Sequence, residues 1–146
     1  MNTTEFTARP TEYSGVVFRS KCEAIFARNL DLRKFSQWEY EPFGGSEWAP
    51  DFWAILPKKT GRGFFSVFIE YKPASVTDTY KTELRERFLK LIPEPNPHAM
   101  FLCCGSPYNS TRESFMLGEN GWKDIEDRLR ILRCLEEAKT FRFDLK

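Results

Sequence analysis

Residues 50–72, PDFWAILPKKTGRGFFSVFIEYK, decide the fold because they contain two strand patterns separated by a basic turn. The first pattern runs from Phe52 to Leu56. The second runs from Phe64 to Lys72 and has the β-branched and aromatic residues typical of an interior strand. A proline, which has no N–H to donate to a sheet, ends each of them. Side chains alternate along a strand, so Glu70 and Lys72 share one face. The stretch therefore predicts a hairpin that carries an acid and an amine near one end.

Patterns on either side of this hairpin predict the rest of a central sheet and two helices. Apolar residues recur at helical spacing from Phe18 to Leu30 and again from Val76 to Ile92, one helix before the hairpin and one after it. Alternating polar and aromatic residues from Gln37 to Phe43 predict a half-buried strand. The continuous apolar run from Ala99 to Cys104 predicts a strand covered on both faces. The predicted order is α-β-β-β-α-β.

The two ends of the chain complete the prediction. Residues 1–15 are expected to form a loose N-terminal arm, and Ser114 to Leu117 one more edge strand. Apolar residues at helical spacing from Trp122 to Leu135 predict a last amphipathic helix. With 146 residues the chain has the usual length of one domain. The sequence therefore predicts a single α/β domain, with a mixed central sheet flanked by helices and an extra helix at the C-terminus.

Composition and charge narrow the functional classes. The chain is 41% hydrophobic and 29% charged, and its first residues lack the pattern of a signal peptide, so we expect a soluble cytoplasmic protein with no membrane partner. A net charge of +1 means that any basic surface for nucleic acid must be local. The only histidine, His98, has no nearby partner, which argues against nucleases and hydrolases that need a histidine base. The four cysteines show no CxxC pairing and are expected to be free, without zinc.

The hairpin holds residues suited to phosphodiester hydrolysis. Asp51 opens the first strand beside the end of its antiparallel partner, so Asp51 and Glu70 can reach one hard divalent cation. Such a cation neutralises charge on the phosphate and lowers the pKa of a bound water, which Lys72 would orient or deprotonate. The competing interpretation is a solvated hairpin in which Glu70 and Lys72 form a weak surface ion pair. An isolated Glu-x-Lys triplet is weak evidence and by itself favours the solvated ion pair.

A longer pattern resembles a known family. Pro50-Asp51 is followed after 18 residues by Glu70-Tyr71-Lys72, and it is preceded by Trp38-Glu39-Tyr40-Glu41-Pro42 and by Tyr13-x-Gly15-x-x-Phe18-Arg19-Ser20-x-x-Glu23. Between about residues 13 and 105 the chain resembles the PD-(D/E)XK nucleases, in particular small nucleases encoded by phages and mobile elements. The resemblance implies a restriction-endonuclease-like αβββαβ core, Mg2+ or Mn2+, and cleavage of the DNA backbone. A homodimer or a larger nucleoprotein assembly is compatible with it.

The resemblance assigns roles residue by residue. It makes Asp51 and Glu70 the metal ligands and Lys72 the residue that handles water. It makes Glu23, on the first helix, an assisting catalytic acid and a further candidate ligand. The backbone carbonyl of Tyr71 is a candidate metal ligand as well. These assignments are what the family pattern implies for this chain.

Two residues leave the assignment open. Ser20 and Glu23 have the spacing of a capping box, in which Ser20 caps a helix and Glu23 reaches back to its N–H. Capping alone is therefore an alternative role for Glu23. The recombination-nuclease branch of the superfamily carries a Gln and a Tyr on the helix after the lysine, and only Tyr80 matches here. The subfamily, and with it the preferred DNA structure, stays open.

Basic and aromatic residues near the hairpin are candidates for contact with DNA, and each set has a structural alternative. The basic set can contact phosphates or be solvated, and it comprises Lys58, Lys59, Arg62 and Arg19. The aromatic set can stack on unpaired bases or belong to the core, and it comprises Trp38, Trp48 and Trp53.

Two functions follow from the sequence. The first is a metal-dependent DNA nuclease, and the alternative is a nucleic-acid-binding or assembly subunit that keeps the nuclease fold without cutting. The acid, acid and lysine favour the nuclease, because a binding module has no need for that set at one edge.

Overall fold

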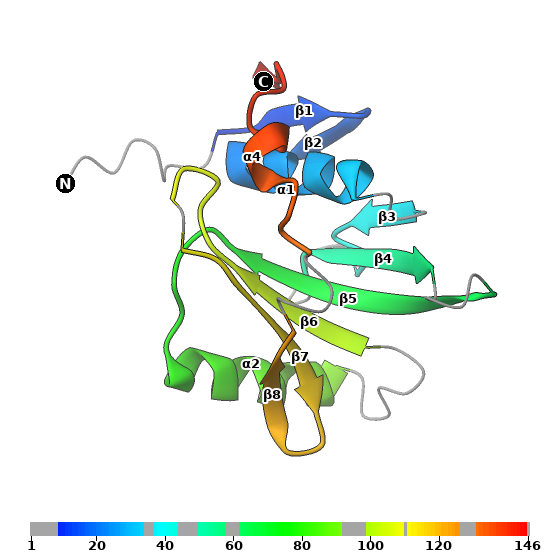
Figure 1. The fold of residues 1–146 in the computed structure, drawn as a ribbon, viewed down its shortest axis with the longest axis vertical. Coiled ribbons are helices and arrows are strands. Elements are labelled where there is room, and N and C mark those ends of the chain that lie inside the picture. The colour runs from blue at the N-terminus through cyan, green and yellow to red at the C-terminus, as the bar shows by residue number, and fades with distance from the viewer. Residues whose placement is uncertain are drawn as a thin grey trace.

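The computed structural model of the chain describes residues 9–33, 37–43, 50–57, 62–91, 99–109, 111–125 and 131–145. They form an α/β fold around a mixed six-stranded sheet with the order β3-β4-β5-β6-β7-β8 (Figure 1). β5 and β6 are parallel, whereas the other neighbouring strands are antiparallel. The strands are β3 (Gln37–Tyr40), β4 (Phe52–Pro57), β5 (Phe64–Lys72), β6 (Ala99–Cys104), β7 (Glu113–Gly118) and β8 (Gly121–Asp124).

Helices cover both faces of this sheet, and a small second sheet lies beside them. Figure 1 places α1 (Lys21–Leu32) and α4 (Leu135–Ala138) on one side of the large sheet and α2 (Asp78–Leu91) on the other. The small sheet has the order β2-β1-β9 and consists of β1 (Thr11–Tyr13), β2 (Val16–Phe18) and β9 (Asp144–Leu145). It joins the two ends of the described chain, since β1 pairs with β9.

The two faces of β5 bury different side chains in two apolar clusters. Val67, Ile69 and Tyr71 belong to the cluster beneath α1, whereas Phe68 belongs to the cluster beneath α2. β6 is buried on both faces, as predicted for its continuous apolar run. Burial of alternate β5 side chains therefore fixes the face on which Glu70 lies, because a shift by one residue would exchange the two faces.

The central part of the sequence prediction is confirmed. β5 and β6 have the predicted bounds, β4 extends by one residue to Pro57, and α2 falls within the predicted helix. The structure is α/β with a mixed sheet, and α1, β3, β4, β5, α2 and β6 follow one another along the chain.

The predicted boundaries before β4 need correction. Thr11 and Tyr13 are buried in β1, although they were expected within a loose arm. Phe18 ends β2, and α1 begins only at Lys21, because the Ser20 hydroxyl accepts a hydrogen bond from the N–H of Glu23 and so caps the helix. β3 stops at Tyr40 rather than at Phe43.

The prediction for the C-terminal part is wrong in two respects. β7 is not an edge strand, because β8 pairs with it beyond a tight turn in which Gly118 faces Gly121. Trp122 lies in β8 and not in a helix, and the helix α4 is confined to Leu135–Ala138. Trp122 and Ile125 have helical spacing, yet each packs against a different apolar cluster. Residues 126–130 of the predicted helix lie outside the described ranges.

No helix in the described part of the chain is long and apolar enough to cross a membrane.

Candidate active site

The start of β4 and the end of β5 bring Asp51 and the Glu70–Lys72 segment together. The antiparallel register pairs Phe52 with Ile69, so Asp51 lies one residue beyond the ladder. There the N–H of Tyr71 donates a hydrogen bond of 2.9 Å to Oδ2 of Asp51. Only 8% of Asp51 is exposed. The predicted meeting of Asp51 with the end of the partner strand is therefore present, and Oδ1 is its second oxygen.

Glu70 lies on the α2 face, where it has two neighbours. The Tyr80 hydroxyl donates to Oε2 of Glu70 over 3.0 Å, and Lys72 Nζ lies 3.8 Å from the same oxygen. Burial and the adjacent Glu70 charge raise the pKa of Tyr80, so its hydroxyl stays a donor. Oε1 of Glu70 is buried and has no hydrogen-bond partner among the described residues. An unpartnered carboxylate oxygen in a buried position is costly and is suited to a cation.

Lys72 reaches solvent from this edge. Its side chain is 45% exposed, and Nζ lies 5.4 Å from the centre of the Tyr80 ring. Glu70 and Lys72 share one face as predicted, but Glu70 is buried with 3% exposure. The pair is therefore not the fully solvated surface pair of the competing interpretation.

Glu23 joins the same region from the first turn of α1. Its Oε1 accepts a hydrogen bond of 2.9 Å from the Tyr40 hydroxyl and one of 3.4 Å from the Ser20 hydroxyl. Its backbone N–H is the one that Ser20 caps, at 3.2 Å. Burial raises the pKa of Glu23, while Arg19 and Tyr40 oppose that rise. The cap is real, yet the Glu23 carboxylate also shares Nη2 of Arg19 with Asp51. We refer to Glu23, Asp51 and Glu70 together as the acid cluster.

Arg19 lies against this acid cluster. Its Nη2 is 3.3 Å from Oε2 of Glu23 and 3.2 Å from Oδ1 of Asp51, and its Nε is 3.4 Å from Oε2 of Glu41. The Tyr40 hydroxyl accepts a further hydrogen bond of 3.0 Å from Nε. The side chain predicted to contact DNA is thus occupied here with carboxylates, and its DNA contact stays a prediction.

The electrostatic surroundings of Asp51 favour the binding of a cation beside its carboxylate. Burial raises the pKa of Asp51 well above its usual value, and the negative charges of Glu70 and Glu23 raise it further. The hydrogen bond from the Tyr71 N–H acts in the opposite direction. A raised acid pKa means that the ionised form is disfavoured in the folded protein, and a bound cation removes that penalty.

The donor set fits a hard cation that keeps part of its water shell. In the described ranges no three His, Cys, Asp or Glu side chains form a group able to hold a metal ion by themselves. Mg2+ commonly binds through one or two carboxylates together with waters and substrate phosphates. Asp51 and Glu70, with Oε1 of Glu70 unpartnered, supply two such carboxylates. The Tyr71 carbonyl and Glu23 stay predicted ligands.

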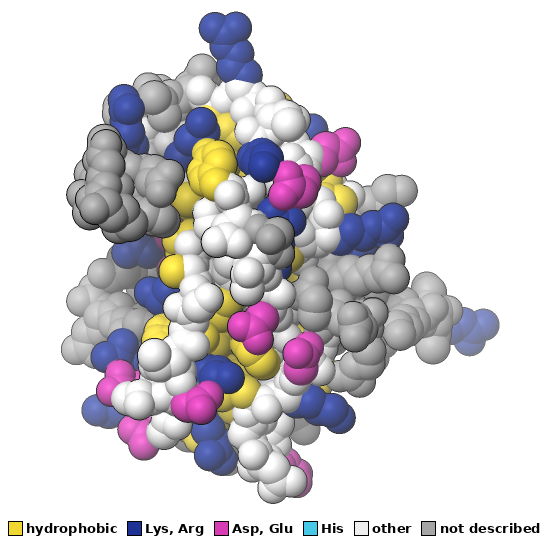
Figure 2. Space-filling view, turned by 60° about the vertical axis from the view of Figure 1, so that its left-hand side comes forward, with side chains coloured by type: hydrophobic (Ala, Val, Ile, Leu, Met, Phe, Trp, Pro, Cys, Tyr) yellow, Lys and Arg dark blue, Asp and Glu magenta, His cyan; other side chains and the backbone are white. Residues whose placement is uncertain are grey.

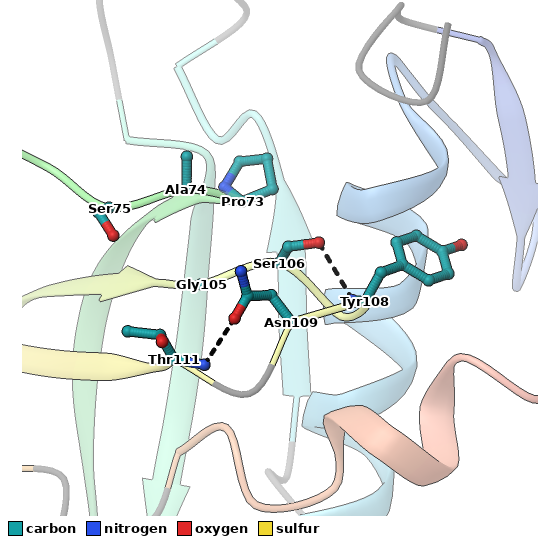
Figure 3. Close-up of a pocket in the computed structure, with 8 residues that line it drawn as sticks. All are labelled: Pro73, Ala74, Ser75, Gly105, Ser106, Tyr108, Asn109 and Thr111. Atoms are coloured by element: carbon teal, nitrogen blue, oxygen red, sulfur yellow. Dashed lines mark hydrogen bonds between the residues drawn. The ribbon is translucent and has the colours of Figure 1, made fainter. Parts of the chain in front are cut away.

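A pocket borders the end of β5 next to Lys72 (Figure 3). Its volume is about 260 Å³, and it lies where the parallel strands β5 and β6 end, a common position for ligands in α/β sheets. At the edge of the pocket the Gly105 N–H donates to the Lys72 carbonyl over 2.8 Å. Among the described residues, the lining carries hydroxyl and amide groups and no charged side chain: Pro73, Ala74, Ser75, Gly105, Ser106, Tyr108, Asn109 and Thr111.

Gly105 shapes this pocket through its backbone. Its φ is +134°, and a Cβ there would lie 2.7 Å from the Thr111 carbonyl oxygen, which no side chain could accommodate without a shift. The Ser106 hydroxyl and the Asn109 side chain each accept a backbone N–H and hold the loop in place. Figure 3 shows the Tyr108 ring pointing away from Ser75.

Only some of the other residues predicted to contact DNA lie within the described ranges. Lys58, Lys59 and Trp48 lie outside the described residues, and Arg62 is exposed. Trp38 and Trp53 are half-buried and pack against the apolar clusters, which favours a role in the core. Figure 2 shows Lys and Arg side chains interspersed with Asp and Glu on the face in view, rather than gathered in one patch.

Sequence reasoning missed how Tyr40, Glu41 and Arg19 surround Glu23. Tyr40 and Glu41 belong to the quoted Trp38–Pro42 pattern without having been given a role. Arg19 lies outside α1, just before its cap, so no helical spacing predicts its contact with Glu23, and only its closeness in sequence points to it.

Comparisons of the chain with protein-family models, with curated proteins and with solved structures found no match.

Proposed function

We propose that this protein is a metal-dependent nuclease of the PD-(D/E)XK type that hydrolyses phosphodiester bonds in DNA. The observation that carries the proposal is the convergence of Asp51, Glu70 and Lys72 at the adjoining ends of β4 and β5, with both carboxylates buried. A buried acid with a raised pKa, here Asp51, near an exposed lysine is a pattern found at functional sites. A fold that only needed stability would gain from apolar residues here.

Each residue has a chemical task in this proposal. Asp51 and Glu70 would hold Mg2+ or Mn2+, and the Tyr71 carbonyl and Glu23 would complete or support the ligand set. The cation supplies charge neutralisation at the phosphate and lowers the pKa of bound water. Lys72 reaches solvent beside Glu70, and from there it would orient the attacking water or take its proton. Tyr80 holds Oε2 of Glu70, so Oε1 is the oxygen left for the cation.

The pocket beyond Lys72 leaves room for the nucleotide next to the reacting phosphate. Its hydroxyl and amide groups are of the kind that contact sugar and phosphate oxygens. Arg62 and the basic residues near it in sequence, Lys58 and Lys59, would add phosphate contacts.

The test is a cleavage assay on supercoiled plasmid and on single-stranded circular DNA. Mg2+ and Mn2+ should support cleavage, and excess EDTA should abolish it. Lys72→Ala should lower the rate by about 100-fold or more, the usual contribution of a positioned acid or base. Lys90→Ala, which removes an exposed lysine from the last turn of α2, is the matched control and should cleave like wild type.

The rival function has a distinct result in the same experiment. DNA binding at low salt without cleavage in any metal would identify a non-cleaving nucleic-acid-binding or assembly subunit. Undiminished cleavage in EDTA, or near-normal cleavage by Lys72→Ala, would show that the active site lies elsewhere.

A further inference from the structure

Arg19 occupies the position facing the acid cluster from the solvent side. It lies in the short link between β2 and α1, and the Tyr40 hydroxyl accepts hydrogen bonds from both its backbone N–H, at 3.2 Å, and its Nε. Its Nη2 is shared between Oδ1 of Asp51, at 3.2 Å, and Oε2 of Glu23, at 3.3 Å. One guanidinium nitrogen thus bridges carboxylates from two different elements.

Arg19 contacts the Asp51 oxygen that accepts no backbone hydrogen bond, where a cation would meet the least competition from the backbone. Oδ2 of Asp51 already accepts the N–H of Tyr71, which leaves Oδ1 as the oxygen open to a second partner. In the structure that partner is Nη2 of Arg19. A divalent cation bound through Oδ1 of Asp51 and the guanidinium would therefore compete for the same place.

The exposed fractions of the three side chains show that Arg19, and not Glu23 or Asp51, can move away from the contact. The Arg19 side chain is 62% exposed, whereas those of Glu23 and Asp51 are 11% and 10% exposed. Arg19 can swing into solvent without opening the core, but the two carboxylates cannot follow it. An ion pair made by so exposed a side chain is weak, and a divalent ion carries twice its charge on a smaller radius.

We propose that Arg19 is a displaceable counter-ion of the acid cluster, which neutralises Asp51 and Glu23 in the metal-free protein and gives way when a divalent cation binds. The proposal rests on the proposed function, because it assumes a divalent cation at Asp51. Once released, the guanidinium stays tethered beside the cluster, where a planar bidentate donor suits a phosphate of the bound DNA. Arg19 is then a positioning residue: it pairs with the carboxylates in the metal-free protein and contacts a DNA phosphate after the cation has bound.

The test measures binding of Mn2+ alone to the metal-free protein by titration calorimetry, without DNA and without turnover. Arg19→Gln removes the competing charge, so the dissociation constant for Mn2+ should fall by about tenfold or more. Arg19→Lys keeps a charge that cannot bridge several carboxylates at once, so its dissociation constant should lie between those of wild type and Arg19→Gln. Arg87→Gln, at an exposed position on α2, should bind Mn2+ like wild type.

Thermal melts provide a second readout that does not depend on calorimetry. In EDTA the Arg19→Gln protein should melt below wild type, because two buried carboxylates lose their counter-ion. Mn2+ should raise the melting temperature of Arg19→Gln by more than that of wild type.

The outcomes separate the two proposals. Equal or weaker Mn2+ binding by Arg19→Gln, with wild type binding and cleaving normally, overturns the role of Arg19 and leaves the nuclease intact. No Mn2+ binding by any of the proteins overturns both, since the divalent site itself would then be absent.

Discussion

Replacing Asp51 by asparagine tests whether its buried charge opposes folding when no cation is bound. The asparagine side chain has nearly the same shape, and its amide oxygen can accept the Tyr71 N–H that now bonds Oδ2. The substitution loses the ion pair with Arg19, which is worth at most about 1 kcal/mol because the Arg19 side chain is 62% exposed. It also removes a buried charge whose pKa is raised by burial and by Glu70 and Glu23.

Removal of this charge should outweigh loss of the ion pair. One pKa unit corresponds to about 1.4 kcal/mol. Removing the cost of even a small rise in the Asp51 pKa therefore outweighs the free energy lost with the Arg19 ion pair. We expect Asp51→Asn to be more stable than wild type in EDTA at pH 7 by about 1 kcal/mol, or about 3–4 °C in melting temperature for a domain of this size. Saturating Mg2+ should reverse the order, because wild type gains about 2.7 kcal/mol when the metal is at 100 times its dissociation constant.

The assay is urea unfolding followed by tryptophan fluorescence, with EDTA and then with Mg2+. Asp78→Asn, at a fully exposed position in the first turn of α2, is the control and should unfold like wild type both in EDTA and in Mg2+. An Asp51→Asn protein that unfolds at lower urea than wild type in EDTA would refute the reasoning that this buried charge opposes folding. If Mg2+ stabilises Asp51→Asn as much as it stabilises wild type, Asp51 is not a metal ligand.

Three further substitutions separate structural from chemical roles. Ser20→Ala should lower the free energy of unfolding by about 1 kcal/mol through loss of the helix cap, with cleavage by the folded protein largely intact. Glu23→Gln should leave stability within about 0.5 kcal/mol yet lower the cleavage rate at least about tenfold, and normal turnover would restrict Glu23 to the cap. Tyr80→Phe removes the donor to Oε2 of Glu70 and should reduce metal affinity or cleavage by about tenfold, measured by Mg2+ titration; an unchanged titration would mean that Tyr80 does not hold Glu70 for the metal.

Local sequence patterns predicted strand bounds and side-chain faces correctly where the interacting residues lie close in sequence. The bounds of β5 and the shared face of Glu70 and Lys72 follow from alternation and from prolines, both of which act within a few residues. The meeting of Asp51 with Tyr71 follows as well, because a hairpin brings its own two ends together. The Ser20 cap likewise depends on residues three apart.

Long-range pairing explains the errors. Nothing in the stretch around Thr11 indicates that it will pair with Leu145 at the other end of the chain, and without that partner a three-residue strand has little reason to form. Trp122 and Ile125 have helical spacing, yet the β7–β8 turn sends them to different clusters. The spacing of apolar residues indicates that they will be buried, but it does not indicate which element will pack against them.

The sequence by itself therefore determined the central hairpin, the buried strand beyond α2 and the placement of Asp51, Glu70 and Lys72 at one edge of the hairpin, because hydrogen-bond geometry and side-chain alternation are properties of short segments. Only the tertiary structure decided that Arg19 lies on Asp51 and that the Tyr80 hydroxyl lies on Glu70. The first contact joins segments separated by α1 and β3, and the second depends on how α2 lies on the face of the sheet that carries Glu70. Packing of that kind is set by the whole core, which no single stretch of the chain contains.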